Sequence, residues 1–412
     1  MYVAVMGYGT VGSGVVEVLT TNRESIGKRS TQGSLDVKYI LDLRDFPEDP
    51  NAQKFTKNFD DILKDDSVKI VVETMGGLHP AFEFISALLK AGKSVVTSNK
   101  ELVAAKGLEL LELAKENNVN FLFEASVGGG IPIIRPIHQC LAANEVEEIA
   151  GILNGTTNFI LTMMIEKNMP FADALRLAQE NGYAERDPSA DIEGHDACRK
   201  ICILASLCFG KHVYPEAVHT EGITDITLED VAYVHSYDAV IKLLGCAKRM
   251  ENGKISAFVE PAIVKNGSQL ASTRDVFNAI LVRGNAVGDV VFYGKGAGKL
   301  PTASAVVADV IDCAQHAKER KDFGWGKSED NYVVDYKTIA APFYVRLVAE
   351  DVASTKENIQ SILGDVTYLA RDNAPQNELA FVTGVQTQDA LQKTLAALSK
   401  VEVLRTLRIT NY

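Results

Sequence analysis

Short apolar runs alternate with amphipathic stretches along the first third of the chain. Residues 2–6, 37–42, 69–73, 94–97 and 120–124 are rich in β-branched side chains and are predicted to be strands, with helical patterns between several of them. The runs are apolar throughout rather than at every second position, so each strand should be buried on both faces. This pattern predicts a doubly wound, parallel α/β sheet with helices on both sides.

The pattern changes at a glycine-rich segment, residues 127–132, and we place the first domain at residues 1–130. Residues 131–295 are predicted to form a mixed α+β domain, with a long helix over 196–209. A second glycine-rich turn, 294–298, leads into a predicted helix that we expect to complete the first domain through residues 296–320. The charged stretch that follows, 318–330, is predicted to be a linker.

The last segment, residues 338–412, has its own pattern. Strand, helix, strand, strand, helix and strand are predicted in that order, at 343–349, 355–363, 366–370, 379–383, 387–399 and 403–410. This order is typical of the ferredoxin-like split βαβ fold. Three domains also agree with a length of 412 residues, which is too long for one compact core.

Three glycines follow the first predicted strand. Gly7, Gly9 and Gly12 form Gly-x-Gly-x-x-Gly at the start of a helical pattern over residues 11–19. The first glycine permits a tight turn, the second lets the backbone approach a pyrophosphate, and the third lets helix and strand pack closely. The alternative is a glycine turn without a ligand, but the position between strand and helix predicts a dinucleotide site.

The end of the second predicted strand bears on the choice of cofactor. An acidic residue there favours the ribose hydroxyls of NAD, whereas a basic residue favours the 2′-phosphate of NADP. Both types occur, as Asp42 and Arg44, and Lys57 could join Arg44. We therefore predict NADP or NAD, with NADP slightly favoured.

Acidic side chains gather at the entrance to the apolar helix 201–209, within the segment 182–200. Asp196 and Lys200 are four residues apart, so they share a helix face and can address one ligand. An ordinary helical salt bridge is the alternative. The apolar residues that follow favour a binding site, because charged side chains at the start of a buried helix are costly unless they have partners.

Composition excludes several classes of protein. A formal charge of −12, from 54 acidic and 42 basic residues, argues against nucleic acid or an anionic membrane as partner. With no apolar run near the roughly 20 residues that cross a bilayer and no basic leader, we expect a cytoplasmic protein. Six cysteines are too few for a disulfide framework, and Cys198, Cys202 and Cys208 are expected to be buried thiols rather than zinc ligands with His195.

Four blocks of residues, taken in order, resemble homoserine dehydrogenase across roughly residues 1 to 320. They are Ser-Asn-Lys-Glu-Leu at 98–102, Glu-Ala-Ser-Val-Gly-Gly-Gly-Ile-Pro at 124–132, Asn-Gly-Thr-Thr-Asn-Phe-Ile-Leu at 154–161 and Gly-Lys-Gly-Ala-Gly at 294–298. The resemblance implies a Rossmann domain, a catalytic and dimerisation domain, and NAD(P)-dependent interconversion of L-aspartate 4-semialdehyde and L-homoserine in threonine and methionine biosynthesis.

The resemblance also implies roles for individual residues. Glu185, Asp191 and Asp196 match positions that bind the amino acid substrate. Lys200 matches the lysine assigned to proton transfer, and Lys100 remains the other candidate. Cofactor contacts are expected from Gly7, Gly9, Thr10, Val11, Gly12, Arg44, Thr74, Ser98, Lys100, Gly296 and Gly298.

Glu124, Val127, Gly129 and Ile131 match a monovalent-cation site made largely of backbone carbonyls. Hard oxygen ligands suit Na⁺ and do not suit zinc. A glycine turn without an ion is the alternative at this position.

The C-terminal segment resembles an ACT domain, a module that often binds an amino acid effector such as threonine. Where the family carries Asp-x-Pro-Gly after the first strand, this chain has Glu-Asp-Val-Ala-Ser at 350–354, without the glycine. A Cβ at the glycine position crowds the approach of backbone to a ligand, so we expect weak threonine regulation or none. The resemblance is to the monofunctional form, and it implies a homodimer or homotetramer.

Two other classes compete with this interpretation. A regulator could keep the nucleotide-binding and ACT-like modules without catalysis, but Glu185, Asp196, Lys100 and Lys200 are all present. A phosphorylating semialdehyde dehydrogenase needs an activated cysteine, and no glycine-framed motif surrounds Cys140.

Overall fold

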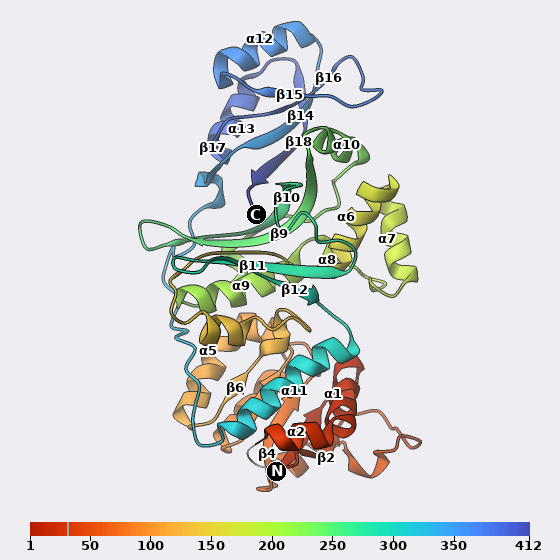
Figure 1. Cartoon of the computed structure of the whole chain (residues 1–412), viewed down its shortest axis with the longest axis vertical. Helices are drawn as coiled ribbons and strands as arrows, with labels where there is room; N and C mark the ends of the chain where they lie inside the picture. The colour runs from red at the N-terminus through yellow and green to blue at the C-terminus, as the bar shows by residue number, and fades with distance from the viewer. Residues whose placement is uncertain (31–32) are drawn as a thin grey trace. The chain divides into compact units, whose positions relative to one another are not determined.

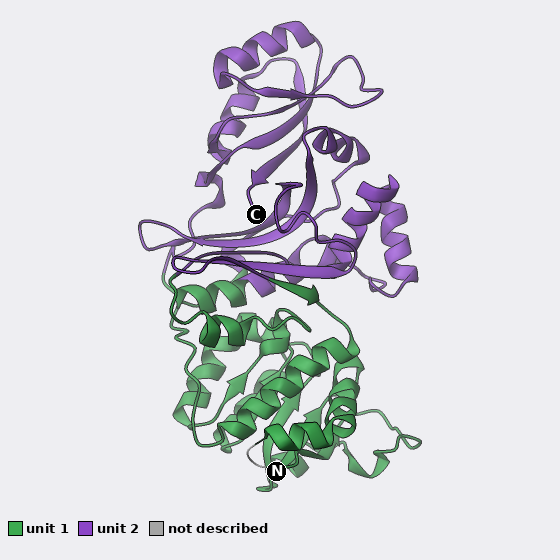
Figure 2. Cartoon of the chain, in the orientation of Figure 1, with its two compact units in different colours: residues 1–145, 202–215, 292–329 green, residues 146–201, 216–291, 330–412 purple. Residues whose placement is uncertain are grey.

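The computed structural model describes residues 1–30 and 33–412. The chain forms two compact units, coloured separately in Figure 2. Unit 1 contains residues 1–145, 202–215 and 292–329. Unit 2 contains residues 146–201, 216–291 and 330–412. None of the described helices is both long and apolar enough to cross a membrane.

Unit 1 is built on a parallel sheet, which confirms the predicted α/β class. Among the described residues its strand order is β3-β2-β1-β4-β5-β6, the order of a dinucleotide-binding Rossmann fold. The central strands are buried, as their continuous apolar runs require. The strands are β1 (Tyr2–Met6), β2 (Asp36–Leu41), β3 (Phe55–Thr56), β4 (Val68–Glu73), β5 (Ser94–Thr97) and β6 (Phe121–Leu122).

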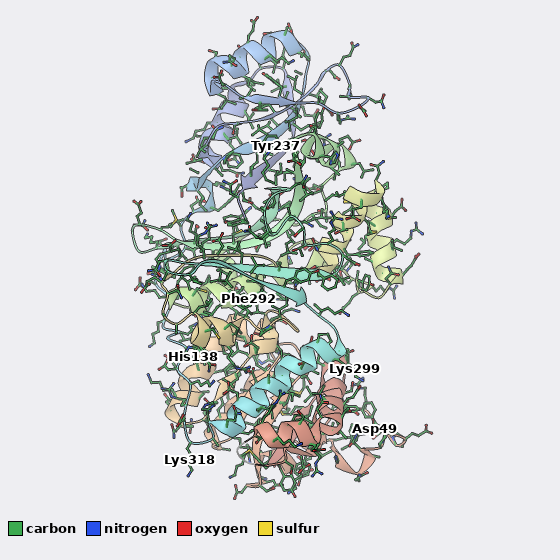
Figure 3. All side chains as sticks on the ribbon, viewed as in Figure 1. Asp49, His138, Tyr237, Phe292, Lys299 and Lys318 are labelled. Atoms are coloured by element: carbon green, nitrogen blue, oxygen red, sulfur yellow. The ribbon has the colours of Figure 1, made fainter. Side chains whose placement is uncertain are left out.

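Helices cover this sheet. They are α1 (Thr10–Thr21), α2 (Arg23–Arg29), α3 (Asp60–Leu63), α4 (Ala81–Lys90), α5 (Lys100–Glu116) and α11 (Lys299–Gln315) (Figure 1). Although α11 is distant in sequence, it packs against α1, where a Cβ at Gly14 would lie 2.9 Å from the Lys299 carbonyl oxygen. Lys299, labelled in Figure 3, also pairs with Glu17 at 2.7 Å. One apolar core joins α1 and α11 to the sheet, through residues that include Val3, Val15, Val72, Val306 and Val310.

The segment predicted to be a linker is closely packed. Residues 318–329 belong to unit 1, where the Trp325 side chain is buried and its Nε1 donates to His212 Nδ1 at 3.0 Å. The ring of Phe323 lies against that of Phe123. The charge and glycine content of this stretch did not indicate these aromatic contacts.

Unit 2 is built on a mixed sheet whose described strands follow the order β12-β11-β7-β9-β10-β18-β14-β16-β15, with β8 paired to β10. The strands from the middle of the chain are β7 (Val146–Ile152), β8 (His219–Thr220), β9 (Ala239–Arg249), β10 (Ile255–Lys265), β11 (Phe277–Gly284) and β12 (Gly288–Lys295). Its helices there are α6 (Gly155–Lys167), α7 (Phe171–Glu180), α8 (Ser189–Ile192) and α10 (Leu228–Ser236). The long helix α9 (His195–Phe209) begins in unit 2 and ends in unit 1.

The C-terminal segment has the predicted order of elements. They are β14 (Phe343–Ala349), α12 (Val352–Leu363), β15 (Thr367–Leu369), β16 (Glu378–Val382), α13 (Gln388–Ala397) and β18 (Val401–Thr410). The sequence pattern did not indicate that β18 also pairs in parallel with β10, where Arg408 lies opposite Ala262. Arg408 Nε donates to Glu260 Oε1 at 2.6 Å, and Tyr412 donates its hydroxyl to Glu148 at 2.7 Å. The segment is therefore continuous with the larger sheet.

Candidate active site

The glycine motif builds an open turn between β1 and α1. Gly7 has a φ of +91°, and its carbonyl oxygen accepts from Thr74 Oγ1 at 2.9 Å. A Cβ at Gly12 would lie 1.9 Å from the Gly7 carbonyl oxygen, so this close packing requires glycine. A Cβ at Gly9 would meet no atom within 4 Å. With Thr10 and Val11 in its first turn, α1 presents an open N-terminus suited to a phosphate.

The end of β2 carries the two side chains that bear on cofactor choice. The Tyr8 N–H donates to Asp42 Oδ2 at 2.8 Å, and Arg44 donates to the same carboxylate through Nε at 3.0 Å and Nη2 at 2.9 Å. The hydrogen bonds from Arg44 hold the pKa of Asp42 below its ordinary value. The Asp42 side chain is 9% exposed and that of Arg44 is 61% exposed, so only the guanidinium is open to solvent. Lys57 pairs with Asp45 instead.

Glu73, which sequence reasoning missed, organises the next loop from the end of β4. Its buried carboxylate accepts the N–H of Met75 at 2.6 Å and of Gly76 at 3.2 Å, and the hydroxyl of Thr97 at 2.6 Å. Burial raises the pKa of Glu73. Glu73 thus ties the loop after Thr74 to the end of β5. An acidic residue that ends an otherwise apolar strand was the available signal.

The Ser98–Leu102 block forms the turn from β5 into α5. Asn99 caps the helix by accepting from the Leu102 N–H at 3.1 Å, and its Nδ2 donates to the Gly77 carbonyl oxygen at 2.7 Å. The Ser98 N–H donates to the Glu73 carbonyl oxygen at 3.4 Å, and Lys100 is the first residue of α5. The structure therefore brings Thr74, Ser98 and Lys100 to the ends of neighbouring parallel strands.

The second glycine-rich turn packs against the first. A Cβ at Gly129 would lie 2.2 Å from the Gly296 carbonyl oxygen, and the Gly130 N–H donates to the Lys295 carbonyl oxygen at 3.0 Å. Gly298 has a φ of +117° and precedes α11. The two turns, matched separately in the sequence, thus form one structure in unit 1.

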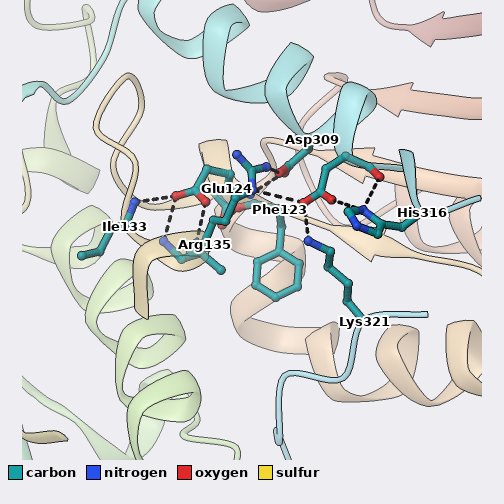
Figure 4. Close-up of polar contacts among 10 residues, drawn as sticks. Phe123, Glu124, Ile133, Arg135, Asp309, His316 and Lys321 are labelled. Atoms are coloured by element: carbon teal, nitrogen blue, oxygen red, sulfur yellow. Dashed lines mark hydrogen bonds and ion pairs between the residues drawn. The ribbon is translucent and has the colours of Figure 1, made fainter. Parts of the chain in front are cut away.

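Glu124 is surrounded by hydrogen bonds (Figure 4). Its carboxylate accepts the N–H groups of Ile133 at 2.6 Å, Ile134 at 2.8 Å and Arg135 at 2.7 Å. The Arg135 guanidinium pairs with Asp309, whose pKa is raised by burial and by the nearby Glu124. The Glu124 carboxylate is thus engaged in holding residues 133–135.

Backbone carbonyls in the same loop show a different environment. Val127, Gly129 and Ile131 are buried, and within the described part of the chain no hydrogen bond reaches their carbonyl oxygens. Buried carbonyls normally have a partner. These three carbonyl oxygens therefore fit the role of ligands to a monovalent cation.

In unit 2, Asn154 lies between two carboxylates. It follows β7 and caps α6, and it is 6% exposed. Its Nδ2 donates to Asp191 Oδ1 at 2.7 Å and to Asp196 Oδ2 at 2.9 Å. Burial, and then the proximity of Asp196, raises the pKa of Asp191. Sequence reasoning missed the role of Asn154, although it lies in the block quoted for the family.

Asp196 and Lys200 share one face of α9, as their spacing indicated. Lys200 Nζ donates to Asp196 Oδ2 at 2.7 Å and to the Leu153 carbonyl oxygen at 2.7 Å. Both side chains are buried, so the pair is not an ordinary salt bridge of the protein surface. Asp191, Asp196, Lys200 and Asn154 form one cluster, which we call the carboxylate–lysine cluster.

Glu185 lies apart from this cluster. It is exposed in the loop after α7, where Gln179 Nε2 donates to its backbone carbonyl at 3.1 Å. The donors of the cluster, Asn154 Nδ2 and Lys200 Nζ, make no described hydrogen bond to the Glu185 carboxylate.

Among the described residues, no group of cysteine and histidine side chains around α9 is close enough to share an ion. Cys198 and Cys202 are buried, as expected, but Cys208, near the end of α9, is only partly buried. His195 is exposed, and its Nε2 lies 3.2 Å from Glu193 Oε2. Across residues 1–30 and 33–412, the one group of acidic, histidine or cysteine side chains close enough to share an ion is His219, Glu221 and Glu260. Arg405 and Arg408 pair with those carboxylates at 3.1 and 2.6 Å, and their charges oppose a cation there.

Comparisons with known proteins agree with these features. Residues 7–124 match the model described as the homoserine dehydrogenase NAD binding domain, and residues 132–311 match the model described as homoserine dehydrogenase. The homoserine dehydrogenase of Pseudomonas aeruginosa is 36% identical, over 97% of this chain and 95% of that protein. That of Bacillus subtilis is 40% identical, over 75% of this chain and 72% of that protein.

Solved structures show the same likeness. A homoserine dehydrogenase from Thiobacillus denitrificans has a TM-score of 0.88 and 34% identity, covering 100% of this chain and 98% of that one. The Staphylococcus aureus enzyme at pH 6.5 has a TM-score of 0.83 and 34% identity, covering 100% and 99%. A hyperthermophilic archaeal homoserine dehydrogenase in complex with NADPH has a TM-score of 0.65 and 29% identity, covering 76% and 97%.

A Rossmann sheet with an open glycine turn, together with the carboxylate–lysine cluster, is typical of a nicotinamide-dependent oxidoreductase. The family matches and the identity over nearly the whole chain show that it belongs to the homoserine dehydrogenase family. Its reaction is the reduction of aspartate semialdehyde to homoserine.

Proposed function

We propose that the carboxylate–lysine cluster is the substrate site of the reversible, NAD(P)H-dependent reduction of L-aspartate 4-semialdehyde to L-homoserine. The observation that carries this assignment is the pair of carboxylates, the half-buried Asp191 and the buried Asp196, which share Asn154 beside Lys200. Two carboxylates suit the α-ammonium group of an amino acid substrate. Glu185, in the exposed loop, is proposed to contact the same substrate.

Lys200 is proposed to act on the aldehyde oxygen. Its ammonium is held by Asp196 and the Leu153 carbonyl, which fixes the position of Nζ. As the aldehyde carbon gains a hydride, its oxygen gains charge, and a positioned ammonium stabilises that charge and supplies the proton. Reduced nicotinamide, when bound, supplies the hydride. Lys100, at the start of α5, is the second candidate for the proton donor.

NADP is the proposed preferred cofactor, with NAD as the alternative. Gly7, Gly9, Gly12, Thr74, Ser98, Gly296 and Gly298 would hold the dinucleotide. The exposed Arg44 guanidinium would meet a 2′-phosphate, whereas Asp42 would accept from the ribose hydroxyls of NAD.

Exchange of Arg44 for glutamate tests that preference. A carboxylate would repel the 2′-phosphate, so Arg44→Glu should shift the ratio of kcat/KM for NADP over NAD toward NAD by about tenfold or more. Lys57→Glu, in the same region but paired with Asp45, is the matched control. An unchanged ratio in Arg44→Glu would show that Arg44 is only solvated.

A monovalent cation, with Na⁺ as the candidate, is proposed at the carbonyls of Val127, Gly129 and Ile131. Glu124 would contribute mainly charge from nearby, because its carboxylate already accepts three N–H groups. Such an ion would stiffen the loop that packs on Gly296.

The C-terminal segment, residues 338–412, is proposed to be an ACT-like module that serves assembly into a homodimer or homotetramer more than threonine sensing. Its last strand pairs with β10, so the module is tied directly to the sheet of unit 2.

Absorbance at 340 nm tests the reaction. The protein should reduce NADP when given homoserine, without added phosphate or thiol. A regulator without catalysis would give no change, and a phosphorylating dehydrogenase would reduce NADP only when given the semialdehyde together with phosphate.

A further inference from the structure

We propose that Asn154 is a positioning residue that joins the carboxylates of Asp191 and Asp196 and fixes them in the orientation that receives the substrate. The proposal rests on the proposed substrate site. Asp191 belongs to α8 and Asp196 to α9, and the Asn154 amide bonds to both, at 2.7 and 2.9 Å. One side chain therefore links two separate helices at the site.

The orientation of this amide is fixed from its other end. Asn154 Oδ1 accepts the Thr157 N–H at 2.9 Å and the Thr157 hydroxyl at 3.1 Å. A reversed amide would point its NH₂ group at the Thr157 N–H, leaving two donors face to face in a buried place. Nδ2 must therefore face the carboxylates, and both of its hydrogens are used.

A neutral donor suits this position. Two carboxylates that lie close together repel each other, and here burial and Asp196 already raise the pKa of Asp191. A second lysine or arginine would reduce that repulsion, but it would compete with the ammonium group of the substrate. An amide supplies one hydrogen bond to each carboxylate and adds no positive charge beyond that of Lys200, which pairs with Asp196.

Asn154→Ser separates this role from helix capping. Serine retains an oxygen that can accept the Thr157 N–H, so the melting temperature should stay within about 2 °C of the original. It cannot donate to both carboxylates. The pKa of Asp191 should then rise, and the acidic limb of kcat/KM for homoserine should move up by about one pH unit. KM for homoserine should rise about tenfold or more, with a smaller fall in kcat.

Asn158→Ser is the matched control. Asn158 is buried on the same helix one turn later, and its Nδ2 donates to the carbonyls of Thr273, Asp275 and Phe277 rather than to a carboxylate. This variant should lower the melting temperature and leave the acidic limb in place. A purely structural role of Asn154 would give the same result for both variants.

The outcomes distinguish the two proposals. If the unaltered protein oxidises homoserine but Asn154→Ser keeps its acidic limb and KM, the positioning role is wrong and the substrate site stands. If the unaltered protein binds NADP but does not turn over homoserine, the proposed function fails first. The carboxyl ¹³C shift of Asp191, followed against pH, reads the same pKa without turnover, and an equal pKa in both proteins would overturn the positioning role.

Discussion

Two strand-to-helix junctions, one in each unit, use the start of a helix in opposite ways; the first belongs to the proposed cofactor site and the second to the proposed substrate site. Between β1 and α1 the N-cap is Gly9, no side chain caps the helix, and a Cβ there would meet open space. Between β7 and α6 the N-cap is Asn154, which is buried and accepts from the Thr157 N–H.

The difference determines the charge of the ligand that each junction suits. An open helix start offers N–H donors to an anion from outside, here the phosphates of a dinucleotide. At the capped start of α6, the Thr157 N–H donates to Asn154 Oδ1 instead of to a ligand. The Nδ2 end of the same amide donates to the carboxylates of Asp191 and Asp196. In the proposed function, the start of a helix would therefore bind an anion in unit 1 and help to bind the ammonium group of an amino acid in unit 2.

Removal of the proposed proton donor should give the largest effect. Lys200→Ala should lower kcat by about 10²- to 10⁴-fold and leave the Kd for NADP nearly unchanged, because the loss is confined to the substrate junction. Lys200→Arg is the companion variant, since it keeps a charge beside Asp196 but does not give up a proton at working pH. Single-turnover rates with homoserine provide the measurement. A larger loss in Lys100→Ala would assign the proton to Lys100.

Substitutions of Gly12 and Gly9, between β1 and α1, should weaken cofactor binding for different reasons. In Gly12→Ala the new Cβ would lie 1.9 Å from the Gly7 carbonyl oxygen, so overpacking should destabilise the protein by about 1–3 kcal/mol and abolish NADP binding. In Gly9→Ala the methyl group meets no protein atom within 4 Å, so only NADP affinity should fall. Melting temperature without cofactor and NADP titration separate the two. An equal drop in melting temperature would show that Gly9 is structural.

Local sequence patterns predicted those features whose partners are close in the chain. Five of the six described strands in the unit 1 sheet were predicted, all but the short β3, and so were the glycine turn and the Asp196–Lys200 pair. Each of these depends on residues within one turn or one strand–helix step. The Asp196–Lys200 spacing indicated a shared helix face, and the structure confirms a 2.7 Å contact.

Features that depend on distant residues were not predictable in this way. Asn154 contacts Asp191 and Asp196, which are 37 and 42 positions away in the sequence. The local sequence pattern gives no information about a contact between residues so far apart. The parallel pairing of β18 with β10 is of the same kind, since Arg408 and Glu260 are 148 positions apart. A polar residue within an apolar run, such as Glu260 in β10, was the signal that a distant partner had to exist.

Neutralising Asp191 should weaken binding but stabilise the protein. The pKa of Asp191 is raised in the folded state, so its charged form costs stability once the pH exceeds the unfolded pKa, and there is no cost at lower pH where both states are protonated. Asp191→Asn should therefore raise the melting temperature at pH 7 but not in acid, and raise KM for homoserine by about tenfold or more. Melting curves across pH give the first result and initial rates the second. A lower melting temperature of Asp191→Asn at pH 7 would contradict the predicted direction of the stability change.

Threonine should have the smallest effect, leaving activity unchanged at millimolar concentration. In an effector site of this module, backbone N–H groups close on the carboxylate of the amino acid. Here Asp351 caps α12 and already accepts the Ser354 N–H at 3.0 Å, so the start of that helix resembles the capped junction of α6 rather than the open one of α1.

The full chain should be used for this test, because truncation after Asp330 would remove β18 from β10 and leave Glu260 without Arg408. Titration calorimetry with threonine should show no sub-millimolar binding, and homoserine oxidation should be equal with and without it. Ser354→Gly, which removes the Cβ at the position of the family's glycine, is the variant most able to gain a response. Threonine inhibition of the unaltered chain at sub-millimolar concentration would show instead that a capped helix start can still bind an anion, because the ligand's carboxylate would have to displace that of Asp351.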